Sequence, residues 1–157
     1  MIVLDKENRV FTLHTQNTTY QMKADENSVL LHTYYGPRVG GGDLSRLIQY
    51  ADRGFCPNPN QVGRRRDYSL DTLPQEYSTC GVGDFRLPSL EFEPQDGSHM
   101  ADLRYVNYQL RPGKYSLEGL PAFWGDQGWE TLVVCLEDPS THMQVELYYG
   151  VLEERDL

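Results

Sequence analysis

The 157-residue sequence has few cysteines, a minority of basic residues and no long apolar run. Its three cysteines, Cys56, Cys80 and Cys135, form no Cys-x-x-Cys pair, whereas a disulfide framework or a zinc site favours paired thiols. No segment approaches the roughly 20 apolar residues of a membrane-spanning helix. Asp5 and Lys6 interrupt the N-terminal apolar residues before a signal sequence could form. We therefore expect three reduced thiols in a cytoplasmic protein that has no membrane partner.

Acidic residues dominate the charge balance. Lys and Arg number 14 against 23 Asp and Glu, which leaves a formal net charge of −9. Binding to nucleic acid or to an anionic membrane needs clustered positive charge, so neither is an expected partner. The glycines at 40–42 lack the Lys-Ser/Thr ending of a phosphate-binding loop, and the four histidines show no helical i, i+3 or i+4 pairing. The sequence therefore predicts no cofactor and no metal site.

Aromatic residues and alternating patterns are what the sequence does have. The 11 Tyr, 5 Phe and 2 Trp argue against disorder, and the length suits one domain. Apolar residues alternate with polar ones over 142–149, and 130–137 (E-T-L-V-V-C-L-E) is a continuous β-branched run, as in a strand covered on both faces. The predicted strands are 9–15, 18–24, 28–35, 103–110, 130–137 and 142–149. Their order predicts a mainly β, antiparallel sandwich.

Turns and loops fill the rest of the chain. Asp96-Gly97 predicts a hairpin turn between 90–92 and 103–105, and 43–50 has the spacing of one short helix that Asp43 could cap. Segment 36–88 is rich in Gly, Pro, Asn and Arg and shows little alternation. Long loops in a compact domain are often functional, so this segment is where we expect a site.

Two further loop features have alternative interpretations. The arginines at 64–66 are expected to be solvated or paired with carboxylates rather than to bind nucleic acid. Trp124 and Trp129 could stack on sugar rings, although a packing role for at least one of them is favoured. Cys135, inside an apolar strand, is expected to be buried.

Four ordered motifs run through the loop segment and into the strand that follows it. Residues 52–59 read D-R-x-F-x-P-N-P, 69–77 read S-L-D-T-L-x-Q-E-Y, 84–88 read D-F-R-x-P, and 102–105 read D-L-R-Y. Together they resemble the N-terminal region of the bacterial α-galactosidases, or melibiases, of glycoside hydrolase family thirty-six. The flanking segments extend the resemblance over essentially the whole chain.

The resemblance implies that residues 1–157 are the first part of an N-terminal β-supersandwich. In that family a (β/α)8 barrel and a smaller C-terminal β domain follow, and two barrel aspartates hydrolyse terminal α-linked galactose with retention, as in melibiose or raffinose-type oligosaccharides. This sequence contains no alternating βα pattern and no barrel motif. We therefore expect the isolated chain to carry no catalytic residue and no enzyme activity, because a retaining glycosidase needs both carboxylates.

The resemblance also implies a site that acts between subunits. In tetrameric members of the family, the aspartate of the D-R-x-F motif binds the galactosyl ring in a neighbouring subunit, and the matching residue here is Asp52. Arg66 and Phe55 would support that loop. The competing interpretation is that Asp52 only shapes the loop by pairing with Arg53, Arg64 or Arg66.

Self-association is the partner relationship that the resemblance implies. The α-galactoside would then be bound only in the full-length oligomer. An alternative function is a free-standing carbohydrate-binding β-sandwich, in which Trp124, Trp129 and loop tyrosines form the stacking platform. Galactoside binding by the isolated chain would discriminate this module from an assembly domain.

Overall fold

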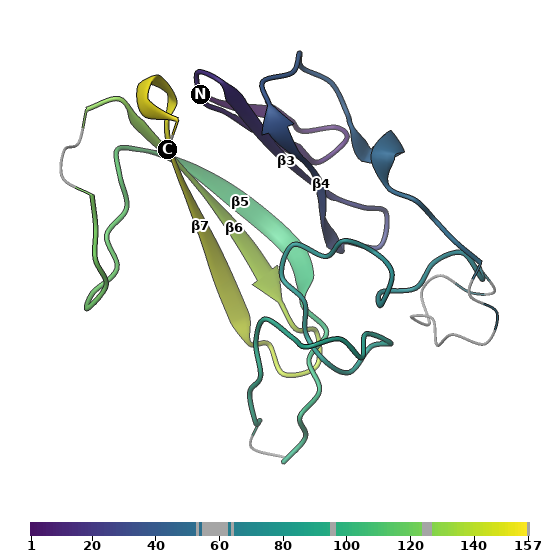
Figure 1. Cartoon of the computed structure of the whole chain (residues 1–157). Coiled ribbons are helices and arrows are strands. Elements are labelled where there is room, and N and C mark those ends of the chain that lie inside the picture. Colours follow the sequence, from purple (N-terminus) through teal and green to yellow (C-terminus); the bar gives the residue numbers. More distant parts are fainter. Residues whose placement is uncertain (53, 55–62, 64, 95–96, 124–126, 157) are drawn as a thin grey trace.

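The structure, a computed structural model, describes residues 1–52, 54, 63, 65–94, 97–123 and 127–156 (Figure 1). Seven strands and two short 3-10 turns make up its regular elements. The elements, in chain order, are β1 (Ile2–Asp5), β2 (Val10–His14), β3 (Thr18–Ala24), β4 (Leu30–Pro37), η1 (Ser45–Leu47), β5 (Arg104–Pro112), β6 (Trp129–Glu137), β7 (Gln144–Leu152) and η3 (Glu153–Arg155).

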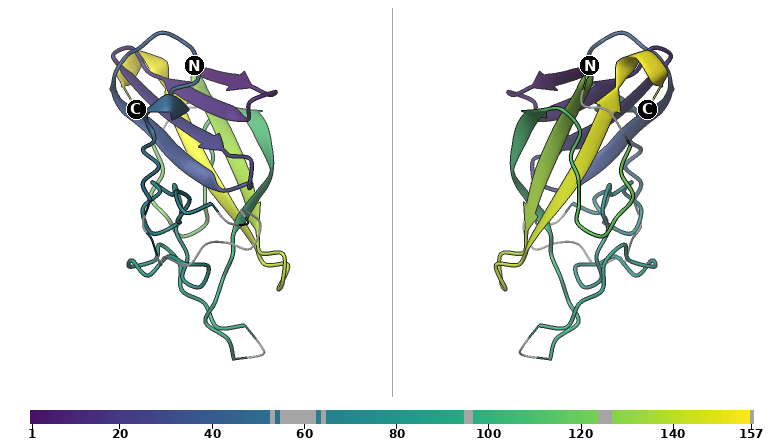
Figure 2. Two further views of the ribbon diagram at one scale, coloured as in Figure 1. Left: turned by 90° about the vertical axis from the view of Figure 1, so that its right-hand side faces the viewer. Right: turned by 90° about the vertical axis from the view of Figure 1, so that its left-hand side faces the viewer.

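The strands form two antiparallel sheets that face each other. One sheet has the order β1-β2-β3-β4, the other β5-β6-β7. Figures 1 and 2 show the two layers, with residues 65–94 of the long β4–β5 connection gathered at one end. The predicted antiparallel β-sandwich is thus confirmed. No helix in the described part of the chain is long and apolar enough to span a bilayer.

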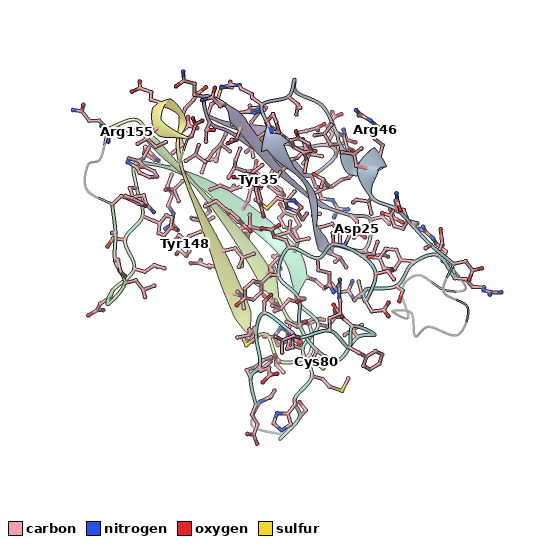
Figure 3. The ribbon with its side chains drawn as sticks, viewed as in Figure 1. Asp25, Tyr35, Arg46, Cys80, Tyr148 and Arg155 are labelled. Carbon is pink, nitrogen blue, oxygen red and sulfur yellow. The ribbon has the colours of Figure 1, made fainter. Side chains whose placement is uncertain are left out.

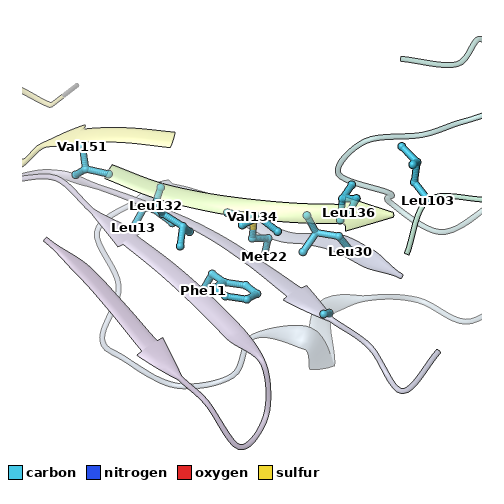
Figure 4. Close-up of a cluster of buried hydrophobic side chains, with 10 residues drawn as sticks. Phe11, Leu13, Met22, Leu30, Leu103, Leu132, Val134, Leu136 and Val151 are labelled. Atoms are coloured by element: carbon cyan, nitrogen blue, oxygen red, sulfur yellow. The ribbon is translucent and has the colours of Figure 1, made fainter. Parts of the chain in front are cut away.

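The core lies between the sheets and is densest around β6. Leu132, Val134 and Leu136 of β6 are buried against Phe11 of β2 and Met22 of β3 (Figure 4). Val133 and Cys135, which alternate with these three residues, are buried as well, so both faces of β6 are covered, and this explains its run of apolar and β-branched residues. The ring of Phe11 also contacts two tyrosines of β5, with centroid distances of 5.7 and 5.5 Å.

Most of the predicted strands lie close to their predicted bounds. The strand at 18–24 is found with the same limits, and the others differ by one to three residues at an end. The strand β1, whose four residues pair with β2, was not predicted. Cys135 is buried as predicted, and desolvation raises the pKa of its thiol. Cys80 and Cys135 are both free thiols, and Cys56 lies outside the described residues.

Two local predictions are wrong. The predicted helix at 43–50 is only the 3-10 turn η1, because the Asp43 carboxylate accepts from the Ser45 N–H at 2.8 Å and from Lys23 Nζ at 2.6 Å. These contacts fix a turn against β3 in place of a continuing helix. The hairpin predicted between 90–92 and 103–105 does not form, because residues 90–92 make only an isolated bridge from Leu90 to Thr79. Prolines at 88 and 94 limit pairing there, and Asp96 of the predicted hairpin turn lies outside the described residues.

Candidate functional site

The loop segment between β4 and β5 has its own small core. Val29, just before β4, and Leu31, within it, pack against Tyr68, Leu70 and Leu73 from the loop. Backbone hydrogen bonds join the same two regions, from the His32 N–H to Pro74 O at 2.7 Å and from the Glu76 N–H to Leu30 O at 2.9 Å. The loop segment is therefore attached to the four-stranded sheet by both packing and backbone pairing.

Tyr68 is the deepest anchor of this small core. Its side chain is fully buried, and its hydroxyl donates to Asp25 Oδ2 at 2.5 Å. Asp25 is itself buried in the β3–β4 turn (Figure 3), where Oδ1 accepts from the N–H groups of Asn27 and Val29. Burial, followed by the hydrogen bond to Asp25, raises the pKa of the Tyr68 hydroxyl, so it remains a neutral donor.

Arg65 connects this anchor to the segment that carries Asp52. Its guanidinium carbon lies 5.6 Å from the ring centroid of Tyr50 and 5.6 Å from that of Tyr68. The two rings stack with centroids 6.4 Å apart and an interplanar angle of 25°. Two nitrogens of Arg65 also donate to the two carboxylate oxygens of Asp67, and a third donates to Glu26 at 2.7 Å.

Asp52 and Arg66, which stand on either side of residues 53–65 in the sequence, form an ion pair. Arg66 donates from Nε to Asp52 Oδ1 at 3.2 Å, and its Nη2 lies 3.2 Å from the same oxygen. The Gly54 N–H also donates to Oδ1, at 2.8 Å, and Gly54 adopts the left-handed backbone (φ +69°) that closes this tight turn. The Asp52 side chain is 58% exposed, so solvent or a ligand can reach it.

A second ion pair braces the D-F-R-x-P motif. Asp84 is buried, and both of its oxygens accept from the Arg86 guanidinium, at 3.0 and 2.8 Å. Arg86 also donates to the carbonyls of Leu70 and Leu73. Burial by itself would raise the pKa of Asp84, but the hydrogen bonds from Arg86 lower it below the usual range. Residues 84–86 of this motif are therefore joined to residues 70–73 of the same loop segment.

The structure brings together two of the three predicted site residues. Asp52 and Arg66 form an ion pair, which is one of the pairings that the sequence analysis considered. Phe55, Arg53 and Arg64 lie outside the described residues, as does Trp124. Trp129 is only 6% exposed and stacks on Phe123 with centroids 6.0 Å apart, so it packs and is not a free stacking surface.

Sequence reasoning missed the residues that support Asp52. No sequence pattern singled out Asp25, and Arg65 was considered only as one of the three arginines at 64–66, although Arg65 and Arg66 contact different partners. Tyr50 and Tyr68, which lie before and after the D-R-x-F-x-P-N-P motif, could have indicated the role of Arg65, because aromatic rings are frequent partners of arginine. Among the described residues, no group of three or more His, Cys, Asp or Glu side chains could hold a metal ion.

The fold defines a two-sheet antiparallel β domain, and three of the four motifs lie in its long β4–β5 connection. Residues 28–157 match the model of the glycosyl hydrolase family 36 N-terminal domain. The chain therefore belongs to this family.

Its relatives are α-galactosidases. The chain is 45% identical to the bifunctional alpha-galactosidase/sucrose kinase AgaSK of Mediterraneibacter gnavus, over 99% of its own length and 17% of that protein. It is 34% identical to alpha-galactosidase Mel36A of Lactobacillus acidophilus, over 99% of its own length and 21% of the relative. The chain thus spans about a fifth of the length of these relatives.

Solved structures agree in fold. The galactosidase domain of AgaSK superposes with a TM-score of 0.93 at 45% identity, covering 98% of this chain and 21% of that one. The alpha-galactosidase AgaB of Geobacillus stearothermophilus gives a TM-score of 0.85 at 36% identity, covering 98% and 21%. A variant of AgaA from the same organism, solved in complex with raffinose, gives 0.83 at 36% identity, covering 92% and 20%.

Proposed function

We propose that this chain is the non-catalytic N-terminal domain of a cytoplasmic, retaining α-galactosidase, and that it forms the first part of a β-supersandwich. Its roles are to assemble the oligomer and to contribute Asp52 to the active site of a neighbouring subunit. The substrate class is terminal α-linked galactose, as in raffinose-type oligosaccharides. Family membership supports the enzyme class, and the names of the relatives support the substrate.

One observation carries the assignment of Asp52. Its carboxylate is exposed, yet Arg66 and the Gly54 N–H hold it on a loop base that is anchored in the core. An ionised carboxylate accepts hydrogen bonds from two adjacent sugar hydroxyls, and such charge-assisted bonds are stronger than neutral ones. A carboxylate held in place before binding also loses less side-chain entropy when the sugar arrives.

The division of labour follows from the chemistry of retention. A retaining glycosidase uses two carboxylates, one as nucleophile and one as acid and base. We assign both to the part of the enzyme beyond these 157 residues. Asp52 acts in recognition, and it does not exchange a proton with the scissile bond.

The test is Asp52→Ala in the full-length enzyme, with Glu118→Gln as a control at an exposed carboxylate on another loop. Loss of two charge-assisted hydrogen bonds should lower kcat/KM roughly 10- to 100-fold, while the oligomer and its thermal midpoint are unchanged. Wild-type kinetics in Asp52→Ala would refute the assignment.

The isolated chain provides a second test. It should show no galactosidase activity, and titration calorimetry with galactose or melibiose should detect no binding, because the neighbouring subunit's site is missing. Millimolar or tighter binding by the monomeric chain would instead identify a self-sufficient carbohydrate-binding module.

A further inference from the structure

Arg65 and Arg66 are consecutive but bind different parts of the loop base. Arg66 contacts Asp52, the residue proposed to meet the sugar. The guanidinium of Arg65 lies 5.6 Å from the ring centroids of both Tyr50 and Tyr68 and donates two hydrogen bonds to Asp67. The two arginines therefore act at neighbouring points of the segment that carries Asp52.

The contacts of Arg65 match the planar shape of its guanidinium. A flat, delocalised cation can lie against two aromatic rings while its edge donates parallel hydrogen bonds to a carboxylate. The Glu26 carboxylate accepts from the remaining Nη1 at 2.7 Å. A lysine would supply the charge but neither the flat surface nor the fork of donors.

These contacts link Asp52 to the core through a short chain of residues. Tyr50 lies two positions before Asp52, and its ring is tied through Arg65 to Tyr68. Tyr68 is fully buried and hydrogen-bonded to Asp25 in the β3–β4 turn. The backbone entering Asp52 is thus attached to the four-stranded sheet.

We infer that Arg65 is a positioning residue for galactoside recognition: by joining Tyr50 to the buried Tyr68, it sets where the Asp52 carboxylate lies. This inference rests on the proposed role of Asp52. Arg65 acts through Asp52, so its contribution exists only while Asp52 is present. Small displacements of a recognition group weaken binding strongly, because hydrogen bonds depend on geometry.

The experiment is a double-mutant cycle in the full-length enzyme: Arg65→Met, Asp52→Ala and both together, with Arg155→Met as a control at an exposed arginine in η3. Arg65→Met should raise KM roughly three- to tenfold with little change in kcat. Added to Asp52→Ala, it should change KM no further. Arg65→Lys should behave like Arg65→Met.

Each outcome separates the inference from the proposed function. If Asp52→Ala keeps wild-type kinetics, both are wrong. If Asp52→Ala is impaired while Arg65→Met matches wild type, only the inference is wrong. Equal effects of Arg65→Met with and without Asp52 would show that Arg65 acts independently. Rescue by lysine would show that charge alone suffices, which would also overturn the stacking role. Circular dichroism and thermal midpoints confirm that each variant is folded.

Discussion

Among single residues, the buried aspartates at turns stabilise the loops of this domain by accepting hydrogen bonds from the backbone. Asp25, Asp84 and Asp138 are all almost completely buried, and each accepts at least one backbone N–H. A buried carboxylate is tolerated only where hydrogen bonds replace its hydration. These aspartates therefore function as fixed acceptors for the loops, a role that their position in polar turn sequences does not reveal.

Asp138 should make the domain sensitive to acid. It accepts from the N–H groups of Asp102, Ser140 and Thr141 at 2.7–2.9 Å. Burial alone would raise its pKa, but these hydrogen bonds lower it below the usual 3.8. The resulting stability is present above pH 3.8 and is lost as the pH falls through the lower folded-state pKa.

We expect Asp138→Asn to flatten this acid dependence. Urea unfolding at pH 5 and at pH 2.5 should show a smaller loss of unfolding free energy in the variant than in the wild type. Equal losses of unfolding free energy in the variant and the wild type would show that Asp138 does not cause the acid sensitivity.

Glu76 bridges the two sheets. Its carboxylate accepts from the hydroxyl of Tyr20 on β3 and, at 2.8 Å, from that of Tyr149 on β7, and His32 lies 3.4 Å away. Glu76→Ala should destabilise the chain by roughly 1–3 kcal/mol, because two tyrosine hydroxyls lose their partner. Tyr149→Phe, which removes one bond and leaves the carboxylate its other donor, should cost less. Urea unfolding at pH 7 measures both, and equal stability of Glu76→Ala and wild type would contradict the bridge.

At the scale of elements, the strands could be predicted because burial imposes a period. The run of apolar and β-branched residues in β6 follows directly from the burial of both of its faces, whereas Thr19 and Gln21 of β3 are buried although they are polar. The segment 43–50 was predicted as a helix but forms a 3-10 turn, because Asp43 pairs with Lys23, a residue that is distant in sequence. The short β1 has too few residues for its alternation to stand out.

The central position of β6 gives the next prediction. Leu132 is fully buried in the core, so Leu132→Ala should destabilise the chain by about 2–5 kcal/mol through lost burial and a residual cavity. Val106, in the edge strand β5, is about half exposed. Val106→Ala should therefore stay within about 0.5 kcal/mol of wild type. Denaturant unfolding compares them, and similar losses would mean that β6 does not form the core described.

At the scale of the whole molecule, the site was only partly predictable. The four motifs and their resemblance pointed to Asp52 as a candidate, and its pairing with Arg66 was one of several alternatives until the fold was known. The supporting chain from Tyr50 through Arg65 to Asp25 joins positions 25 and 65, which no local pattern connects. Tertiary contacts between a turn and a loop of this length leave no period in the sequence.

The surface of the isolated chain predicts self-association. Phe85 and Leu87 are 76% and 91% exposed, on either side of Arg86, whose guanidinium is hydrogen-bonded to Asp84. The strands β5 and β7 also lie at the edges of their sheet. Exposed apolar side chains and open strand edges both favour contact with another copy.

We expect light scattering at about 50 µM to detect dimers or larger species, whose share rises with concentration. Phe85→Ser combined with Leu87→Ser should shift the chain toward monomer. Leu47→Ser, at an exposed leucine in η1, is the matched control and should leave the distribution unchanged. A wild-type chain that stays monomeric would show that the exposed Phe85 and Leu87 do not drive self-association. Assembly of the enzyme would then depend on surfaces outside this domain.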